Sequence, residues 1–111
     1  LIKLDVEGME AEALRGAAKT IATHRPLLYV ENDRIERSAE LITMLLQMDY
    51  DVWWHVVPYF RAHNFAGNAQ NVFGRAGGIN MFCAPKSFVV QPNIPDLRKV
   101  TNPDEHPLKN N

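Results

Sequence analysis

The sequence contains one cysteine, no long apolar run and no excess of charge of either sign. Because Cys83 has no partner, an internal disulfide is excluded, which fits a reducing compartment and leads us to expect a cytoplasmic protein. No apolar stretch approaches the ~20 residues that cross a bilayer, so we expect no membrane span. The 12 Lys and Arg residues against 13 Asp and Glu residues give a net charge of −1. This balance argues against a nucleic-acid partner, because such proteins usually carry a basic face.

The length and composition are those of one globular unit or part of one. Of 111 residues, 46% are hydrophobic and 23% are charged, which excludes a disordered or collagen-like chain. The sequence begins at Leu1, inside an apolar run. We therefore expect a fragment of a larger domain.

The pattern of apolar residues predicts alternating strands and helices. Short β-prone runs predict strands, and apolar spacings of three and four predict helices. In order, we expect a strand at 1–6, a helix at 9–23, a strand at 27–31, a helix at 34–48, and strands at 50–57 and 79–84. Pro26 is expected to end the first helix and to hold Arg25 in extended geometry.

Two segments stand outside this alternation. Residues 58–78 form a long connection rich in asparagine and glycine, and such loops inside a compact domain are often functional. Residues 87–111 are polar and contain several prolines, which predicts an extended or disordered tail after a domain at 1–86.

The element order predicts an α/β layer with parallel strands and right-handed crossovers. The last two strands have no helix between them, which predicts an antiparallel, hairpin-like insertion at one edge. The first strand resembles an interior strand, although no helix precedes it. We therefore expect that the N-terminal half of a doubly wound sheet is absent.

Three blocks of the sequence resemble the C-terminal half of FkbM-family methyltransferases. They are IKLDVEG at 2–8, LRGA at 14–17, and RP leading into YVE at 25–31. Segments at 64–68, 71–73 and 79–85 are similar to the end of the same domain in part of the family.

The resemblance implies an S-adenosylmethionine-dependent enzyme, acting mostly as an O-methyltransferase on a small-molecule or glycan acceptor. It also implies the C-terminal half of a three-layer Rossmann-like fold. Its sheet would be mostly parallel, with one antiparallel strand, the last, inserted between its neighbours.

The glycine-rich loop and the acidic residue that hold the cofactor in that family have no counterpart in this chain. We therefore expect these residues to form the substrate-side wall of the crevice, and neither to bind the cofactor well nor to turn over. An apolar strand without its neighbour also predicts a homo-oligomer, and pairing of first strands across a two-fold axis is one way to form it. A non-catalytic interaction module is the alternative function. Half of a nicotinamide dehydrogenase is a weaker one, because no GxGxxG turn is present.

Asp5 and Glu7 follow the first strand. The resemblance places the transferring methyl group near Asp5, which would act as a catalytic residue and contact the cofactor together with Glu7. The alternative interpretation is that both carboxylates only stabilise the start of the following helix.

Glu31 and Asn32 end the second strand on the same rim, where we expect them to bind substrate. With Asp5 they resemble the magnesium site of catechol-type O-methyltransferases, because oxygen ligands suit a hard divalent ion. We favour the alternative that these carboxylates form hydrogen bonds with the loop backbone and bind no metal.

Two histidines are further catalytic candidates. His55 follows a pair of tryptophans, Trp53 and Trp54, whose side chains are expected on opposite faces of their strand, and His63 lies in the long connection. Packing in an aromatic strand is the alternative role for His55. Asn64, Asn68 and Asn71 are expected to bind the acceptor, or otherwise to form turns. Cys83, in an apolar strand, is expected to be a buried, inert thiol.

Overall fold

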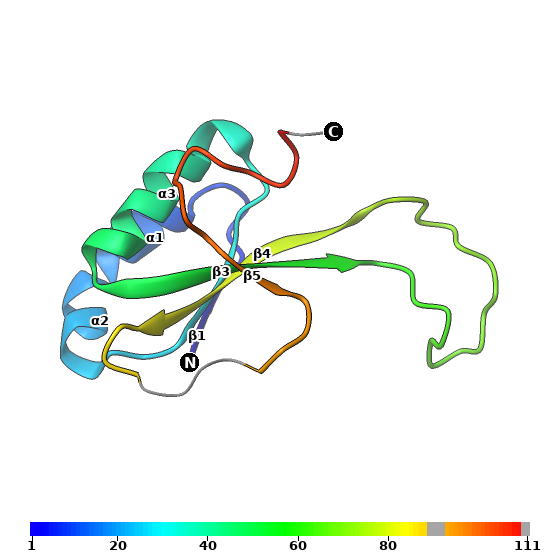
Figure 1. Cartoon of the computed structure of the whole chain (residues 1–111), viewed down its shortest axis with the longest axis horizontal. Helices are drawn as coiled ribbons and strands as arrows, with labels where there is room; N and C mark the ends of the chain where they lie inside the picture. The colour runs from blue at the N-terminus through cyan, green and yellow to red at the C-terminus, as the bar shows by residue number, and fades with distance from the viewer. Residues whose placement is uncertain (89–92, 110–111) are drawn as a thin grey trace.

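The computed structural model describes residues 1–88 and 93–109. These residues form five strands and three helices in one α/β unit (Figure 1). In chain order they are β1 (Ile2–Leu4), α1 (Glu10–Gly16), α2 (Ala18–His24), β2 (Leu28–Glu31), α3 (Ile35–Gln47), β3 (Tyr50–Pro58), β4 (Gly77–Pro85) and β5 (Leu97–Lys99). The α/β class is confirmed. None of the described helices is long and apolar enough to cross a membrane.

Two local features differ from the sequence pattern. The helix expected at 9–23 is divided at Ala17, whose backbone (φ −98°, ψ 7°) separates α1 from α2. Arg25, expected in extended geometry, is instead left-handed, with φ 47° and ψ 53°. Its guanidinium donates to the carbonyl oxygens of Met48 (2.8 Å) and Asp49 (3.0 Å). These long-range hydrogen bonds hold a backbone conformation that the rule for residues before proline did not foresee.

The strands are ordered β1-β2-β4-β3-β5. Only β1 and β2 pair in parallel, and the other three pairings between described strands are antiparallel. The prediction of a mostly parallel sheet with one antiparallel strand is therefore corrected. β4 returns between β2 and β3, as the resemblance implied, so the predicted hairpin lies inside the sheet and separates two strands of like direction. β5 then adds a second reversed strand at the far edge.

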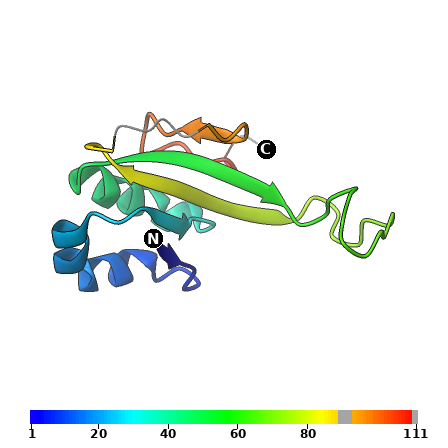
Figure 2. The same cartoon turned by 90° about the horizontal axis from the view of Figure 1, so that it is seen from below.

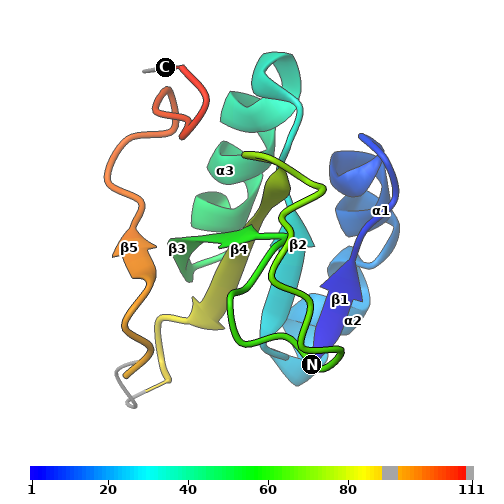
Figure 3. The same ribbon diagram turned by 90° about the vertical axis from the view of Figure 1, so that its right-hand side faces the viewer.

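All three helices lie on one face of the sheet, where α1 and α3 are side by side (Figure 3). Arg15 of α1 forms an ion pair with Glu40 of α3, and Arg37 of α3 with Glu12 of α1. The core between helices and sheet contains fully buried side chains from every layer, among them Leu14, Ile21, Leu28, Val30, Ile42, Leu45, Tyr50, Val52, Met81 and Cys83. Cys83 is buried, as expected. With helices on one face, the predicted three-layer arrangement is not confirmed.

The opposite face of the sheet carries half-buried aromatic side chains between exposed lysines. Strand register places one row across all five strands: Lys3, Tyr29, Phe82, Trp53 and Lys99. The rings of Trp53 and Phe82 lie 5.9 Å apart, and the Lys99 ammonium is 4.7 Å from the centre of the Trp53 ring. Trp54 points to the helices and is only 2% exposed, which confirms that the two tryptophans lie on opposite faces.

Residues 93–109 pack onto the domain, which differs from the expected extended or disordered tail. They contribute β5, and two of their side chains, Val100 and His106, are buried. Residues 89–92 and 110–111 of that expected tail lie outside the described residues.

The long connection forms an arm, defined as residues 59–76. It leaves the ends of β3 and β4 and extends away from the α/β layer along the longest axis of the molecule (Figures 1 and 2). The molecule measures 46 × 30 × 24 Å, and the arm accounts for the elongated shape.

Candidate functional site

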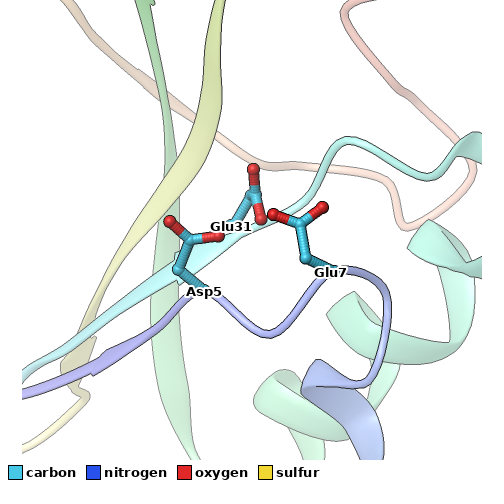
Figure 4. Close-up of side chains that lie close together, drawn as sticks. All are labelled: Asp5, Glu7 and Glu31. Atoms are coloured by element: carbon cyan, nitrogen blue, oxygen red, sulfur yellow. The ribbon is translucent and has the colours of Figure 1, made fainter.

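Three carboxylates gather at the carboxyl ends of β1 and β2. One oxygen from each of Asp5, Glu7 and Glu31 lies within 4.8 Å of the others, and Figure 4 shows the side chains turned toward one another. Because β1 and β2 pair in parallel, residues that follow β1 lie beside those that end β2. Asp5 and Glu31 are therefore neighbours because β1 and β2 pair in parallel.

The turn after β1 places Glu7 by an unusual backbone. Glu7 has φ 55° and Gly8 has φ 98°, so two successive residues are left-handed. Only glycine adopts the second value readily, which explains Gly8. The Glu7 carboxylate accepts a hydrogen bond from Arg34 (3.2 Å), which also contacts Asp33 (3.0 Å). Arg34 thus holds Glu7 beside the other carboxylates.

Side chains of α1 and α3 also hold the turn at Glu7 and Gly8. Arg37 of α3 donates to the carbonyl oxygen of Gly8 and to Glu12. Glu10, 4% exposed, accepts the backbone N–H of Val6 at 3.1 Å. Glu10 and Glu12 therefore stabilise the loop at the start of α1, in the manner the sequence had offered as the alternative role for Asp5 and Glu7.

Glu31 is protonated more readily than an ordinary glutamate. A hydrogen bond with Asp5, partial burial and the negative charges of Asp33, Asp5 and Glu7 raise its pKa from 4.5 to about 8. Its Oε2 atom is buried and lacks a donor among the described residues. With a pKa of about 8, Glu31 is protonated near neutral pH and donates a hydrogen bond to Asp5.

Asp5 and Glu31 border a cleft of about 300 Å³ on the uncovered face of the sheet. It is lined by Lys3, Asp5, Tyr29, Glu31, Val57, Tyr59, Gly78 and Asn80. Burial raises the pKa of Tyr29, and its hydroxyl lies 2.7 Å from Nδ1 of His55. Sequence reasoning did not assign Tyr29 or Asn80 to the site. The two-residue period of strands places Tyr29 on the same face as Glu31 and was the available signal.

His55 and His63 do not meet Asp5. His55 lies on β3, and its ring packs edge-on against Tyr29, with centres 5.9 Å apart. This is the packed role that the sequence offered as the alternative to catalysis. His63 is exposed in the arm and is not among the residues that line the cleft.

Asn32 is 3% exposed and points into the interior. Its Nδ2 donates to Ser38 Oγ at 2.9 Å, and its carbonyl oxygen lies 2.8 Å from Nε2 of His106. The predicted contact with substrate is corrected, because this burial leaves Asn32 joining β2, α3 and the C-terminal segment.

Asn64, Asn68 and Asn71 form turns inside the arm. Asn64 donates to the carbonyl oxygens of Arg61 and Asn68, and the Asn68 side chain accepts the amide of Gln70. Asn71 donates to the carbonyl of Gly74 and accepts the amide of Phe73. These local bonds match the alternative role in turns, and acceptor binding by these residues stays a prediction.

The carboxylates also have the composition of a site for a hard cation. The trio differs from the one considered from the sequence, because exposed Glu7 replaces buried Asn32. Glu7 is already neutralised in part by Arg34. Exposed acidic groups commonly lie together without an ion, and we assign no metal here.

Comparison with known proteins adds one finding. No curated protein and no solved structure matches this chain. Residues 1–52 match the family model described as the methyltransferase FkbM domain. The matched residues run from β1 to the start of β3 and include Asp5, Glu7 and Glu31. The match supports a methyltransferase in general terms, for the part of the chain that holds the three carboxylates.

Proposed function

We propose that this chain forms the acceptor side of an S-adenosylmethionine-dependent methyltransferase that acts on hydroxyl oxygen, within a Rossmann-like domain. The observation that carries the proposal is the Asp5–Glu31 pair, whose carboxylate oxygens lie within 4.8 Å of each other at the border of a cleft. The family match over residues 1–52 supports the class of reaction.

In the proposed reaction, Asp5 accepts the proton of the acceptor hydroxyl as its oxygen gains the methyl group. Glu31 keeps its proton near neutral pH and donates a hydrogen bond to Asp5, which fixes the orientation of the base. Arg34 and the Gly8 turn hold the neighbouring carboxylate. Much of the rate comes from orientation, which in well-placed reactants is worth ~7–11 kcal/mol.

The carboxylate cluster fits the charge of the proposed cofactor. S-adenosylmethionine, when bound, supplies a methyl group on a positively charged sulfur. Asp5 and Glu7 offer negative charge for such a cation, beside a buried Glu31 oxygen without a donor. The sequence has no glycine-rich turn after a strand to hold the nucleotide part. We therefore propose that the chain alone binds the cofactor weakly and does not turn over.

The cleft chemistry favours a polyhydroxylated acceptor, such as a small molecule or a glycan. Tyr29 and Tyr59 offer ring surfaces, and Asn80 and Lys3 offer donors to hydroxyl oxygens.

Backbone amide NMR with added S-adenosylmethionine tests the proposal. Millimolar cofactor should shift the amides of residues 5–8 and 31, and Asp5→Asn should reduce these shifts. S-adenosylhomocysteine, whose sulfur is uncharged, should shift them less. Glu36→Gln, an exposed substitution on α3, is the control. Absence of shifts at these residues would contradict the site, and micromolar binding would contradict the weak affinity.

A non-catalytic interaction module remains the second candidate, because β1 lies at the edge of the sheet and pairs on one side only among the described strands. Assembly through β1 without any cofactor-dependent shift would favour it.

A further inference from the structure

The arm displays large apolar side chains far from the core. Phe65 is fully exposed, at 108%, Val72 is 69% exposed, and Phe73 is 51% exposed. The arm's own asparagine bonds hold the turns that carry them. Phe65, Val72 and Phe73 line one hollow of the arm, and a contiguous exposed apolar patch marks an interaction site.

The arm is also the basic part of the molecule. Residues 59–76 contain Arg61 and Arg75 and no Asp or Glu. Both arginines are exposed, and neither forms an ion pair within the described residues. Since the whole chain carries −1 and the arm carries +2, the remainder carries −3. The arm therefore has a positive net charge and the remainder of the chain a negative one.

We propose that the arm docks on an anionic membrane surface. Phe65 and Val72 enter the boundary between headgroups and acyl chains, and Arg61 and Arg75 contact lipid phosphates. The rest of the chain has a net negative charge and is repelled by the same surface. The molecule therefore approaches the membrane with the arm first.

The shape of the arm favours a membrane over a protein partner. A stable protein interface usually buries about 800 Å² on each side, which calls for a broad face. The apolar residues here lie on a narrow projection, held away from the α/β layer (Figure 2). A membrane needs only a few inserted side chains together with basic residues. Tyr59 lies at the base of the arm and lines the carboxylate cleft, so docking brings that cleft near the lipid surface.

Co-sedimentation with vesicles tests the proposal independently of methyl transfer. The chain should bind phosphatidylcholine vesicles that contain about 30% phosphatidylglycerol and bind pure phosphatidylcholine far less. Phe65→Ser should weaken binding about tenfold, because an apolar group no longer leaves water. Arg61→Gln and Arg75→Gln should each weaken it about fivefold, and added salt should weaken it further.

Matched substitutions outside the arm are the controls. Ile94→Ser removes an exposed apolar side chain, and Lys19→Gln with Lys86→Gln removes two exposed charges, and both variants should bind like the parent. Circular dichroism confirms that each variant is folded. The proposal is overturned if the parent chain does not bind anionic vesicles, or if the arm variants bind as well as the controls. It is also overturned if they change self-association in sedimentation but not vesicle binding.

Discussion

Asp5 and Glu31, which belong to different strands, place carboxylate oxygens within 4.8 Å of each other. Their proximity contributes to a Glu31 pKa of about 8. Two like charges this close are costly when both are ionised, so the fold favours the protonated form of one of them.

Stability should fall as pH rises from 4.5 to about 8. In this window Glu31 is protonated in the folded chain and ionised in the unfolded one, so the folded state binds more protons and loses stability with rising pH. Glu31→Gln mimics the protonated form and should flatten the dependence, whereas Glu36→Gln should not. Urea unfolding across this range measures the effect, and an unchanged slope in Glu31→Gln would contradict it.

Two glycine substitutions should have opposite effects. A Cβ at Gly77 would lie 2.6 Å from the carbonyl oxygen of Val57, so Gly77→Ala should cost about 1–3 kcal/mol at the start of β4. Gly16, in α1, has open space around it, and Gly16→Ala should stabilise the chain by about 0.4–1 kcal/mol. Chemical denaturation of the two variants gives the comparison. Equal effects would show that the close approach at Gly77 is relieved by movement.

His106 should anchor the C-terminal segment. Its ring is 2% exposed, packs against Trp54 at 5.2 Å, and lies 2.8 Å from the carbonyl oxygen of Asn32. His106→Ala should destabilise the segment by about 1–3 kcal/mol, because a buried carbonyl loses its partner. Hydrogen exchange of residues 97–109 measures it, with exposed Glu105→Ala as the control. Unaltered protection in His106→Ala would exclude an anchoring role.

The free edge of β1 should drive self-association. Ile2 donates to the Leu27 carbonyl at 2.8 Å, so the amide of Lys3 faces the other way, toward the open edge. Lys3→Pro removes that donor without removing a bond to β2, and should shift a dimer toward monomer. Lys3→Gln is the control, because it changes the same side chain and keeps the backbone N–H. A proline elsewhere, such as Lys19→Pro, is unsuitable because it breaks a helix. Sedimentation at high concentration decides, and a monomeric parent chain would contradict the prediction.

The local pattern of the sequence was sufficient for most of the elements and for the three carboxylates of the site. Apolar spacing of three and four predicted α3, and the apolar run at 27–31 predicted β2. Both signals come from residues that are close together in the sequence. Asp5 and Glu31 were found as carboxylates at strand ends. Their residue type and position required no knowledge of distant contacts.

Only the tertiary structure decided how these pieces act together. The insertion of β4 between β2 and β3 sets which side chains share the cleft, and it brings Tyr29 to His55 across the sheet. Arg25 and Asn32 were misjudged, because their partners are Met48, Asp49 and His106, far along the chain. Such contacts join residues that are distant in the sequence, so they depend on the tertiary fold. The charge and periodicity of neighbouring residues do not predict them.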